Sequence, residues 1–375
     1  MNEPYKTLTN VNQSQMQLIE ARRQRAHDLV AVALDAIDPL KATRRALQSL
    51  HGQVNLEGCT VFAFGKAARG MAEGVLREVR PRRGVVHCFD QGQLGPLRLV
   101  KSAHPAPAYD AAERGQEALE LARSLGPNDV ALCLVSGGGS AMLECPRPGI
   151  SLAQLSEESM TLMRAGADIT TLNARRRELS AIKGGGLAEA IRPALVITVI
   201  ISDTPGAPLE TVASGPTLPA DFTVVAADHL TARDAVIKAA PDLRPIEELL
   251  HGEARDVGAQ LAQLTPGFVA TGETTVTVTG QGRGGRNHEL VIGALSAWRA
   301  QRAAQGLILS MGTDGIDGSS DAAGAWCDEA LLQLAPDPAH AITHNDTHHY
   351  FQSLNAQIKT GPTGTNVADL VLSLP

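Results

Sequence analysis

Several loops of this sequence combine small residues with one or two reactive groups, and each loop directly follows a short apolar run. The three clearest runs and the residues that follow them are "TVFAF" (60–64) before Gly65-Lys66, "VALCLV" (130–135) before Ser136-Gly137-Gly138-Gly139-Ser140, and "ALVITVII" (194–201) before Asp203. In open α/β sheets, ligands bind beyond the carboxyl ends of the strands. These loops are therefore candidates for one shared binding site.

Two loops farther along the chain carry more charge. The stretch "GETTVTVTGQGRGGRNHE" (272–289) places Arg283 and Arg286 among glycines, and "GTDGIDGSSDAAG" (312–324) contains Asp314 and Asp317. Guanidinium groups are forked donors that suit phosphate or carboxylate oxygens. Mg²⁺ needs only one or two carboxylates beside phosphate oxygens. Together with Lys66, these residues predict phosphoryl transfer, which needs cations and donors around the moving group.

Each of these motifs has a second interpretation when taken alone. The glycine run can be a tight turn that needs positive φ, Lys66 an ordinary surface lysine and Asp203 a helix cap. Gly280, Gly282 and Gly285 match the G-x-G-x-x-G dinucleotide fingerprint, with Asp314 as the ribose-binding acid, which would indicate a nicotinamide-dependent reductase. His104, in "SAHPAPA", is interpreted as a packed turn residue rather than as a general base.

The hydrophobic pattern predicts the elements that must position these residues. Helical spacing covers 14–37, and short apolar runs alternate with amphipathic stretches along 60–201, which predicts a parallel sheet with helices on both faces. Later in the chain we expect a strand at 274–279, a helix over 287–303 and a strand at 306–311. The Pro- and Gly-rich stretch "GPTLPADFT" (215–223) predicts two domains, residues 1–220 and 221–375.

Composition limits the function classes. The 375 residues are 43 % hydrophobic, carry a net charge of −7 and are only 3 % aromatic, so nucleic acid is a poor partner. Five cysteines without a CxxC pair fit a reducing compartment. No apolar run is long enough to span a membrane, and the first residues lack a signal-peptide pattern. We expect a soluble cytoplasmic protein, monomeric or homodimeric, with small-molecule substrates.

Taken together and in order, these loops resemble the class II glycerate 2-kinases, also called the MOFRL family, whose members are often labelled hydroxypyruvate reductases. The resemblance rests on "FGKAA", "HPAP", "VSGGGSA", "GADITTLNARRRELSAIKGGGLA", "ISDTPG…VASGPT", the two charged loops above and "TGPTGTNVADL". It implies a Rossmann-like parallel-sheet N-terminal domain, a smaller α/β C-terminal domain and an active site in the cleft between them. It also implies ATP- and Mg²⁺-dependent phosphorylation of the 2-hydroxyl of D-glycerate.

The resemblance also suggests roles for individual residues. The expected catalytic residues are Lys66, Asp203, Arg283 and Arg286, the expected metal ligands are Asp314 and Asp317, and the expected cofactor-binding residues are Ser136, Gly137, Gly138, Gly139, Ser140, Lys183, Glu273 and Asn287. The chain departs from the family pattern at Ala108, Tyr109 and Gly186. The alternatives are therefore a kinase of a related sugar acid, an NAD(P)H-dependent hydroxypyruvate reductase and a non-catalytic binding protein.

Overall fold

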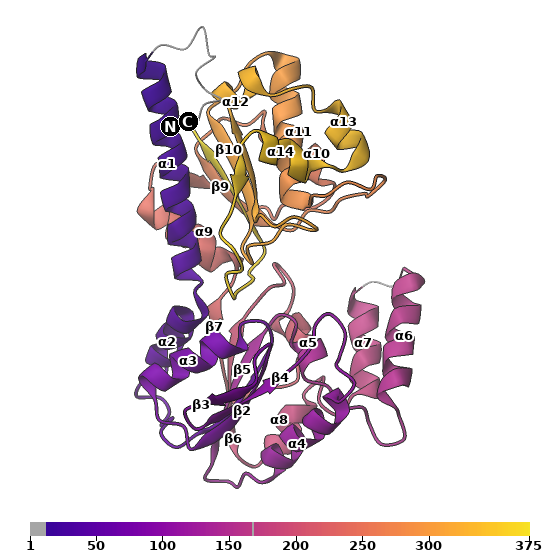
Figure 1. The fold of residues 1–375 in the computed structure, drawn as a ribbon. Coiled ribbons are helices and arrows are strands. Elements are labelled where there is room, and N and C mark those ends of the chain that lie inside the picture. The colour runs from indigo at the N-terminus through magenta and orange to yellow at the C-terminus, as the bar shows by residue number, and fades with distance from the viewer. Residues whose placement is uncertain (1–12, 167–168) are drawn as a thin grey trace. The chain divides into compact units, whose positions relative to one another are not determined.

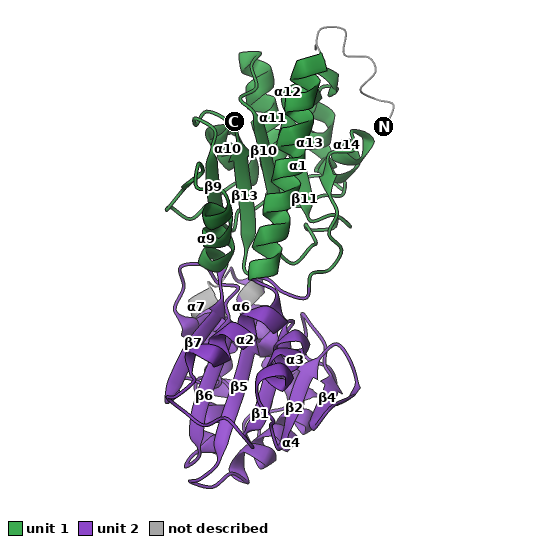
Figure 2. Ribbon diagram, turned by 90° about the vertical axis from the view of Figure 1, so that its left-hand side faces the viewer, with its two compact units in different colours: residues 1–36, 229–363, 367–375 green, residues 37–228, 364–366 purple. Residues whose placement is uncertain are grey.

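The structure, a computed structural model, describes residues 13–166 and 169–375, so Ala167 and Asp168 of the "GADITTLN" stretch lie outside the described residues. The chain forms two compact units, which are drawn in different colours in Figure 2. Unit 2 contains residues 37–228 and 364–366, and unit 1 contains residues 1–36, 229–363 and 367–375.

Unit 2 is built on a seven-stranded sheet with the order β3-β4-β2-β1-β5-β6-β7 (Figure 1). Every neighbouring pair is parallel except the edge pair β3–β4. The strands are β1 (Thr60–Phe64), β2 (Arg83–Cys88), β3 (Gly92–Leu94), β4 (Leu97–Lys101), β5 (Val130–Ser136), β6 (Leu195–Ile201) and β7 (Phe222–Ala227). Without β3, this order is that of a doubly wound Rossmann sheet, and it reverses between β1 and β5.

Helices surround this sheet. They are α2 (Pro39–Ser49), α3 (Ala68–Glu78), α4 (Ala111–Arg123), α5 (Gly139–Met142), α6 (Leu152–Arg164), α7 (Ile169–Leu179), α8 (Gly186–Ile191) and the 3₁₀ segment η2 (Leu209–Ser214). Local sequence sets their ends: Asp38 accepts the Lys41 N–H at 2.9 Å and Pro39 occupies the first turn of α2. The central strands β1, β5 and β6 are mostly apolar and almost entirely buried because helices cover both faces, which confirms the predicted parallel-sheet N-terminal domain.

Unit 1 has a six-stranded sheet with the order β12-β11-β10-β13-β9-β8, in which only β8 and β9 pair in parallel. Its strands are β8 (Arg244–Pro245), β9 (Phe268–Gly272), β10 (Leu307–Gly312), β11 (Gly324–Asp328), β12 (Gln357–Ile358) and β13 (Asp369–Leu374). Its helices are α1 (Gln13–Ala36), α9 (His229–Ala239), α10 (Ala254–Leu261), α11 (Arg286–Gln301), α12 (Glu329–Leu334), α13 (Ala339–His344) and α14 (Thr347–Ser353).

The expected division into residues 1–220 and 221–375 differs from these units mainly at the N-terminus. Helix α1 belongs to unit 1, where Arg23 forms a bidentate ion pair with Asp328 at 2.7 and 3.1 Å and lies 4.5 Å from the centre of the Trp326 ring. Arg22 pairs with Glu329 at 2.6 Å in the same way. These partners are about 300 residues away, so sequence order gives no sign of them.

The strand expected at 274–279 is wrong. The nearest strand, β9, ends at Gly272, before the expected segment begins. Within that segment the side chain of Val278 is 71 % exposed to solvent. Its backbone is held by side chains: the Thr277 N–H donates to Glu253 at 3.0 Å and the Thr279 N–H to Asn345 at 2.9 Å. Alternating Thr and Val favour extended backbone, but here no neighbouring strand pairs with it beyond a single bridge at Thr275.

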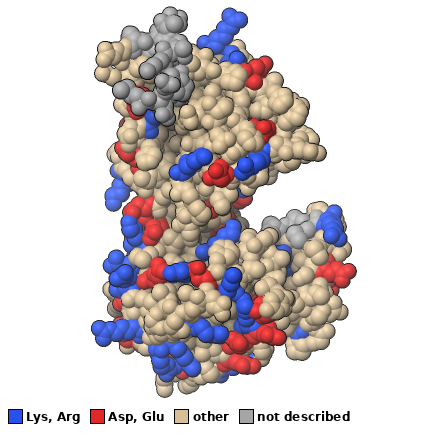
Figure 3. All heavy atoms as spheres, in the orientation of Figure 1, with Lys and Arg blue, Asp and Glu red and all other residues tan. Residues whose placement is uncertain are grey.

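The surface carries both signs of charge. On the face drawn in Figure 3, basic and acidic side chains are interspersed over both units. Among the described helices, none is both long and apolar enough to cross a bilayer.

The Arg23–Asp328 pair generates a prediction about α1. Asp328 is fully buried and also accepts the Leu331 N–H at 2.8 Å, so Asp328→Ala removes the carboxylate that pairs with Arg23 and caps the first turn of α12. We expect a loss of about 3 kcal/mol or more in the free energy of unfolding of unit 1, measured by chemical denaturation. The matched control is Asp242→Ala, which removes the more exposed Arg25–Asp242 pair of the same helix and costs under about 1 kcal/mol. Equal losses in the two variants would contradict the assignment.

Candidate active site

The loops after β1 and β5 meet at the point where the strand order of unit 2 reverses. The Lys66 N–H donates to the Gly137 carbonyl at 2.9 Å, and the Ala67 N–H donates to the Ser136 hydroxyl at 3.1 Å. Such reversal points are where doubly wound sheets bind their ligands. The predicted residues Lys66 and 136–140 therefore lie together at the expected end of the sheet.

Two glycines permit this close approach. At Gly65, whose φ is +118°, a side chain would overlap the Ser136 hydroxyl and the Gly137 carbonyl. At Gly137, a side chain would overlap the carboxylate of Asp203, which follows β6. The bare backbone is thus a requirement of three loops meeting in one place, and it brings Asp203 to the same site.

His104 is a member of this site that the sequence interpretation missed. A Cβ placed on Gly138 would lie 3.0 Å from the His104 ring and 3.1 Å from Lys66 Cγ, so both side chains lie next to Gly138. Burial, and then the positive charge of Lys66, lower the pKa of His104 below its usual value. The imidazole is therefore neutral near pH 7 and able to accept a proton. The only signal in the sequence was its place in a proline-rich loop after β4.

The site of unit 2 is suited to an anion. Within residues 13–166 and 169–375, no ion pair involves Lys66, so its charge is not neutralised by a carboxylate. The backbone N–H groups of Gly138, Gly139 and Ser140 also donate to no protein acceptor in the described chain. Unpaired N–H groups in a loop that contacts the side chain of an unpaired lysine are donors that suit phosphate or carboxylate oxygens.

Lys183, expected to bind the cofactor, is buried in an ion pair. Its side chain is 2 % exposed and pairs with the fully buried Glu144, which also accepts the Ser180 hydroxyl at 2.5 Å. Burial lowers the pKa of Lys183 to about 7. The pair joins the chain after α5 to the "KGGG" turn, whose Gly184 N–H donates to the Ser214 carbonyl at 3.0 Å. In this structure Lys183 holds loops in place, and its role in cofactor binding stays a prediction.

In unit 1, Arg286 is neutralised by carboxylates. Its guanidinium donates to Asp369 at 2.5 and 3.0 Å and to Glu273 at 2.5 Å. Burial raises the pKa of Asp369 to about 6, against the lowering effect of Arg286. Sequence reasoning missed Asp369, although a carboxylate at the start of the apolar strand β13 is an unusual feature. Arg286 and Glu273 are thus brought together, as partners of each other.

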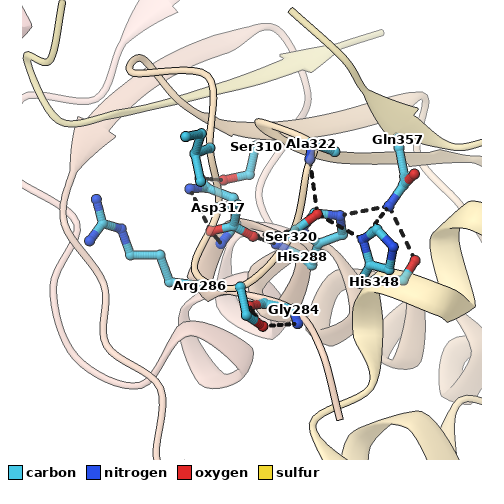
Figure 4. Close-up of polar contacts among 12 residues, drawn as sticks. Gly284, Arg286, His288, Ser310, Asp317, Ser320, Ala322, His348 and Gln357 are labelled. Carbon is cyan, nitrogen blue, oxygen red and sulfur yellow. Dashed lines mark hydrogen bonds and ion pairs between the residues drawn. The ribbon is translucent and has the colours of Figure 1, made fainter. Parts of the chain in front are cut away.

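Asp317, expected to hold a metal, caps α11 instead. One carboxylate oxygen accepts the backbone and side-chain N–H groups of Asn287 at 3.0 and 3.2 Å. The other accepts the His288 N–H at 2.9 Å and contacts His288 Nδ1 at 2.5 Å. Figure 4 shows this carboxylate among its donors, and from His288 the polar contacts continue through Gln357 to His348 and Ser320. Four donors occupy both oxygens, so Asp317 does not fit as a metal ligand.

Asn287, expected to bind the cofactor, belongs to the same buried cluster. Its amide N–H donates to Asp369 at 3.1 Å, and its carbonyl accepts the Ser310 hydroxyl at 2.6 Å. Asp314 differs from Asp317 in being half-buried, with one oxygen that accepts the Ile316 N–H at 3.1 Å. Asp314 therefore keeps capacity for a ligand.

The glycines of the dinucleotide fingerprint have a structural explanation. Side chains at Gly280, Gly282 and Gly285 would overlap His344, Asp346 and Asp317. Two backbone hydrogen bonds hold this loop against residues 344–348. The Gly282 N–H donates to the His344 carbonyl and the His348 N–H donates to the Arg283 carbonyl, both at 2.8 Å. Because Asp317 also occupies the N-terminal N–H groups of α11, no place remains there for a pyrophosphate.

Arg283 is the cation of this loop that no carboxylate neutralises. Its guanidinium is exposed and donates to the Ser319 carbonyl at 3.2 and 3.0 Å. No ion pair of the described residues includes it. Arg283 therefore retains donors for an anionic ligand, and its catalytic role stays a prediction.

A doubly wound sheet with an unpaired lysine and a glycine loop at its reversal point defines an α/β protein whose strand-end loops suit a small anion. Residues 25–245 match the family model described as a domain of unknown function, DUF4147, and residues 267–369 match the model of the MOFRL family. The chain belongs to this family, that of the class II glycerate 2-kinases.

Relatives agree with this assignment. The chain is 31 % identical to a D-glycerate 2-kinase of Thermotoga maritima, over 95 % of this chain and 99 % of the relative. It is 33 % identical to a putative hydroxypyruvate reductase of Agrobacterium vitis, over 83 % of this chain and 98 % of the relative. The crystal structure of the glycerate kinase of Thermotoga maritima superimposes with a TM-score of 0.85 at 30 % identity, over 94 % of this chain and 99 % of that one.

The buried Lys183–Glu144 pair generates the prediction of this subsection. Lys183→Met leaves a buried carboxylate without its partner, and we expect a loss of about 3 to 5 kcal/mol in the free energy of unfolding. Lys183→Met with Glu144→Gln removes both charges and restores most of that stability, measured by denaturation of the two variants. If turnover returns with stability, the lysine acts by holding the loops. Recovery of stability without turnover would instead indicate direct contact with the cofactor.

Proposed function

We propose that this protein is a glycerate 2-kinase, which transfers the terminal phosphoryl group of ATP to the 2-hydroxyl of D-glycerate. The new bond forms between phosphorus and O2, the bond to ADP breaks, and the hydroxyl proton leaves O2. The observation that carries the proposal is the unpaired Lys66 beside the glycine loop 136–140 at the reversal point of the sheet. The kinase relatives, which this chain matches along nearly their whole length, support it.

In this proposal, Lys66 and Arg283 supply the positive charge. Phosphoryl transfer spreads negative charge over the oxygens of the moving group, and fixed donors stabilise that charge. Lys66 and Arg283 lack a neutralising carboxylate in the described chain, whereas Arg286 has two. Arg286 therefore acts mainly by holding Glu273, Asp369 and the start of α11 in place.

A divalent cation fits two of the expected carboxylates. Asp314 keeps an oxygen available, and Asp203 lies at the glycine loop, whereas Asp317 is fully occupied by hydrogen bonds. Mg²⁺ is bound in kinases by one or two carboxylates together with substrate phosphates, so either carboxylate by itself is a sufficient protein ligand. When bound, Mg²⁺ would neutralise phosphate charge, and we propose Asp203 or Asp314 as its protein ligand.

His104 is the proposed acceptor of the O2 proton. It lies beside Lys66 and Gly138, and its lowered pKa keeps the ring neutral at physiological pH. A neutral imidazole within reach of the hydroxyl can act as a general base.

A reductase would need the dinucleotide site that the fingerprint suggested. Gly280 and Gly282 of that fingerprint contact His344 and Asp346, and Gly285 contacts Asp317, which caps the helix that would face a pyrophosphate. Kinase chemistry is therefore favoured over hydroxypyruvate reduction, even though one relative carries the reductase name.

The deciding experiment is an ADP-release assay on the full chain with ATP, with and without Mg²⁺. The acceptor panel contains D-glycerate, L-glycerate, D-lactate and a longer sugar acid, and a parallel reaction contains NADH with hydroxypyruvate. We expect ADP release with D-glycerate and Mg²⁺, and 2-phosphoglycerate as product. Oxidation of NADH without any need for ATP would overturn the proposal.

Removal of either unpaired cation has a predicted cost. Lys66→Ala and Arg283→Gln each remove one stabilising charge, so we expect kcat to fall by about 100-fold or more while the melting temperature stays near that of the wild type. Lys101→Ala, which removes an exposed lysine at the end of β4 in the same sheet, is the control and keeps normal turnover. Near-normal turnover in Lys66→Ala would remove that residue from the mechanism.

The pH dependence of turnover tests His104. The base acts when neutral, so kcat/KM for glycerate is constant above about pH 7 and falls at lower pH, through a pKa below the ordinary 6.5 of histidine. His104→Gln lowers kcat/KM by about 100-fold or more and removes this acidic decline. An unchanged acidic decline in the variant would show that another group accepts the proton.

A further inference from the structure

A chain of three polar side chains ends at the glycine loop of unit 2. The Ser140 hydroxyl lies 3.3 Å from the Ser214 hydroxyl, which in turn lies 3.2 Å from the side-chain carbonyl oxygen of Asn173. Ser214 and Asn173 are buried, whereas Ser140 is half-buried. These three hydrogen-bonded side chains therefore run from the interior of unit 2 to the surface of the candidate site.

The backbone that presents Ser214 is strained. Ala213 and Ser214 both have left-handed φ values, +51° and +64°, which side-chain-bearing residues rarely adopt. The turn is held against the glycine loop, because a side chain at Gly139 would lie 2.8 Å from Ala213 Cβ. It is held on its other side by Gly184 and Gly185, whose N–H groups donate to the Ser214 and Gly215 carbonyls. Strain of this kind persists where the surroundings fix a side chain for a purpose.

The residue types in this row of side chains decide which hydroxyl group donates each hydrogen bond. Ser214 has a single hydroxyl proton, and it donates that proton to Asn173. The contact between the two serines therefore requires Ser140 to be the donor and Ser214 the acceptor. The Ser140 hydroxyl proton is therefore used in the hydrogen bond to Ser214, and only the lone pairs of the Ser140 oxygen remain for a ligand. Ser140 is thus an acceptor toward the site, which suits a hydroxyl group and does not suit a phosphate or carboxylate oxygen.

We propose that Ser140 recognises the non-reacting 3-hydroxyl of glycerate by accepting its hydrogen bond, and that Ser214 and Asn173 are positioning residues that fix the direction of the Ser140 proton. The proposal rests on the proposed kinase function. The reacting 2-hydroxyl must lose its proton, and a serine that has already donated its own is no proton acceptor. Gly138 lies beside Lys66 and His104. It is only two residues from Ser140, so the Cα atoms of Gly138 and Ser140 are at most about 7 Å apart. A three-carbon acid can span that distance.

The proposal predicts a specific change in acceptor selectivity. D-lactate has the 2-hydroxyl and the carboxylate of D-glycerate but lacks the 3-hydroxyl. We expect the wild type to favour D-glycerate over D-lactate in kcat/KM by tenfold or more. In Ser140→Ala this ratio falls by about tenfold, because kcat/KM for glycerate drops while that for lactate and the KM for ATP stay within about twofold. Ser140→Thr, which keeps the hydroxyl, retains the ratio.

Ser214→Ala tests the positioning role, because it leaves Ser140 in place but frees its proton to point toward the ligand. We expect the glycerate-to-lactate ratio to fall in this variant too, without a change in the KM for ATP. Asn173→Asp keeps an oxygen that accepts the Ser214 hydroxyl proton, so we expect it to retain the glycerate-to-lactate ratio. This second variant tests the positioning role if Ser214→Ala folds poorly. Ser156→Ala, in helix α6, is the matched control.

The outcomes separate the two proposals. A wild-type protein that releases no ADP with glycerate overturns the kinase function and this inference with it. An active kinase whose glycerate-to-lactate ratio is the same in the wild type and Ser140→Ala overturns the inference alone. A Ser140→Ala variant that raises the KM for ATP and leaves the ratio unchanged assigns Ser140 to the nucleotide instead.

Discussion

The contact between the loops after β1 and β5 is the constraint on which the site of unit 2 depends. Two hydrogen bonds join Lys66 and Ala67 to Gly137 and Ser136, and they form only because Gly65 and Gly137 have no side chains. The strands that carry these loops are neighbours at the reversal of the sheet order. Helices from the two halves of the sheet diverge at such a point, which leaves room for a ligand. The lysine, the glycine loop, His104 and Asp203 meet there as a consequence.

Glycine has a different role in the second charged loop. The loop 280–285 follows the backbone of 344–347 closely, and its glycines serve that contact rather than a ligand. Carboxylates then distinguish the two arginines of the loop. Arg286 lies between Asp369 and Glu273, whereas the Arg283 guanidinium donates to a carbonyl group and pairs with no carboxylate of the described residues. Two residues that look equivalent in "GRGGR" therefore differ in whether their charge is available.

Much of the fold of unit 2 was predictable because its signals are local. The runs that form β1, β5 and β6 are apolar, flanked by small residues and bounded within about one residue of the observed strands. A parallel sheet buried on both faces requires such runs. In unit 1 the local signal failed at 274–279, where β-favouring residues have no partner strand, because pairing is a property of the neighbours rather than of the segment.

The sequence by itself determined the chemistry that is present: a lysine, arginines, aspartates and bare glycine loops at strand ends, in an order that identifies the family. Only the tertiary structure decided which of these groups are available. Lys183, Arg286 and Asp317 have partners that are distant in the chain, Glu144, Asp369 and Asn287 among them, and such partners neutralise or occupy them. Whether a charged group is paired depends on what lies within a few ångströms in space, and residue type and spacing do not encode that distance.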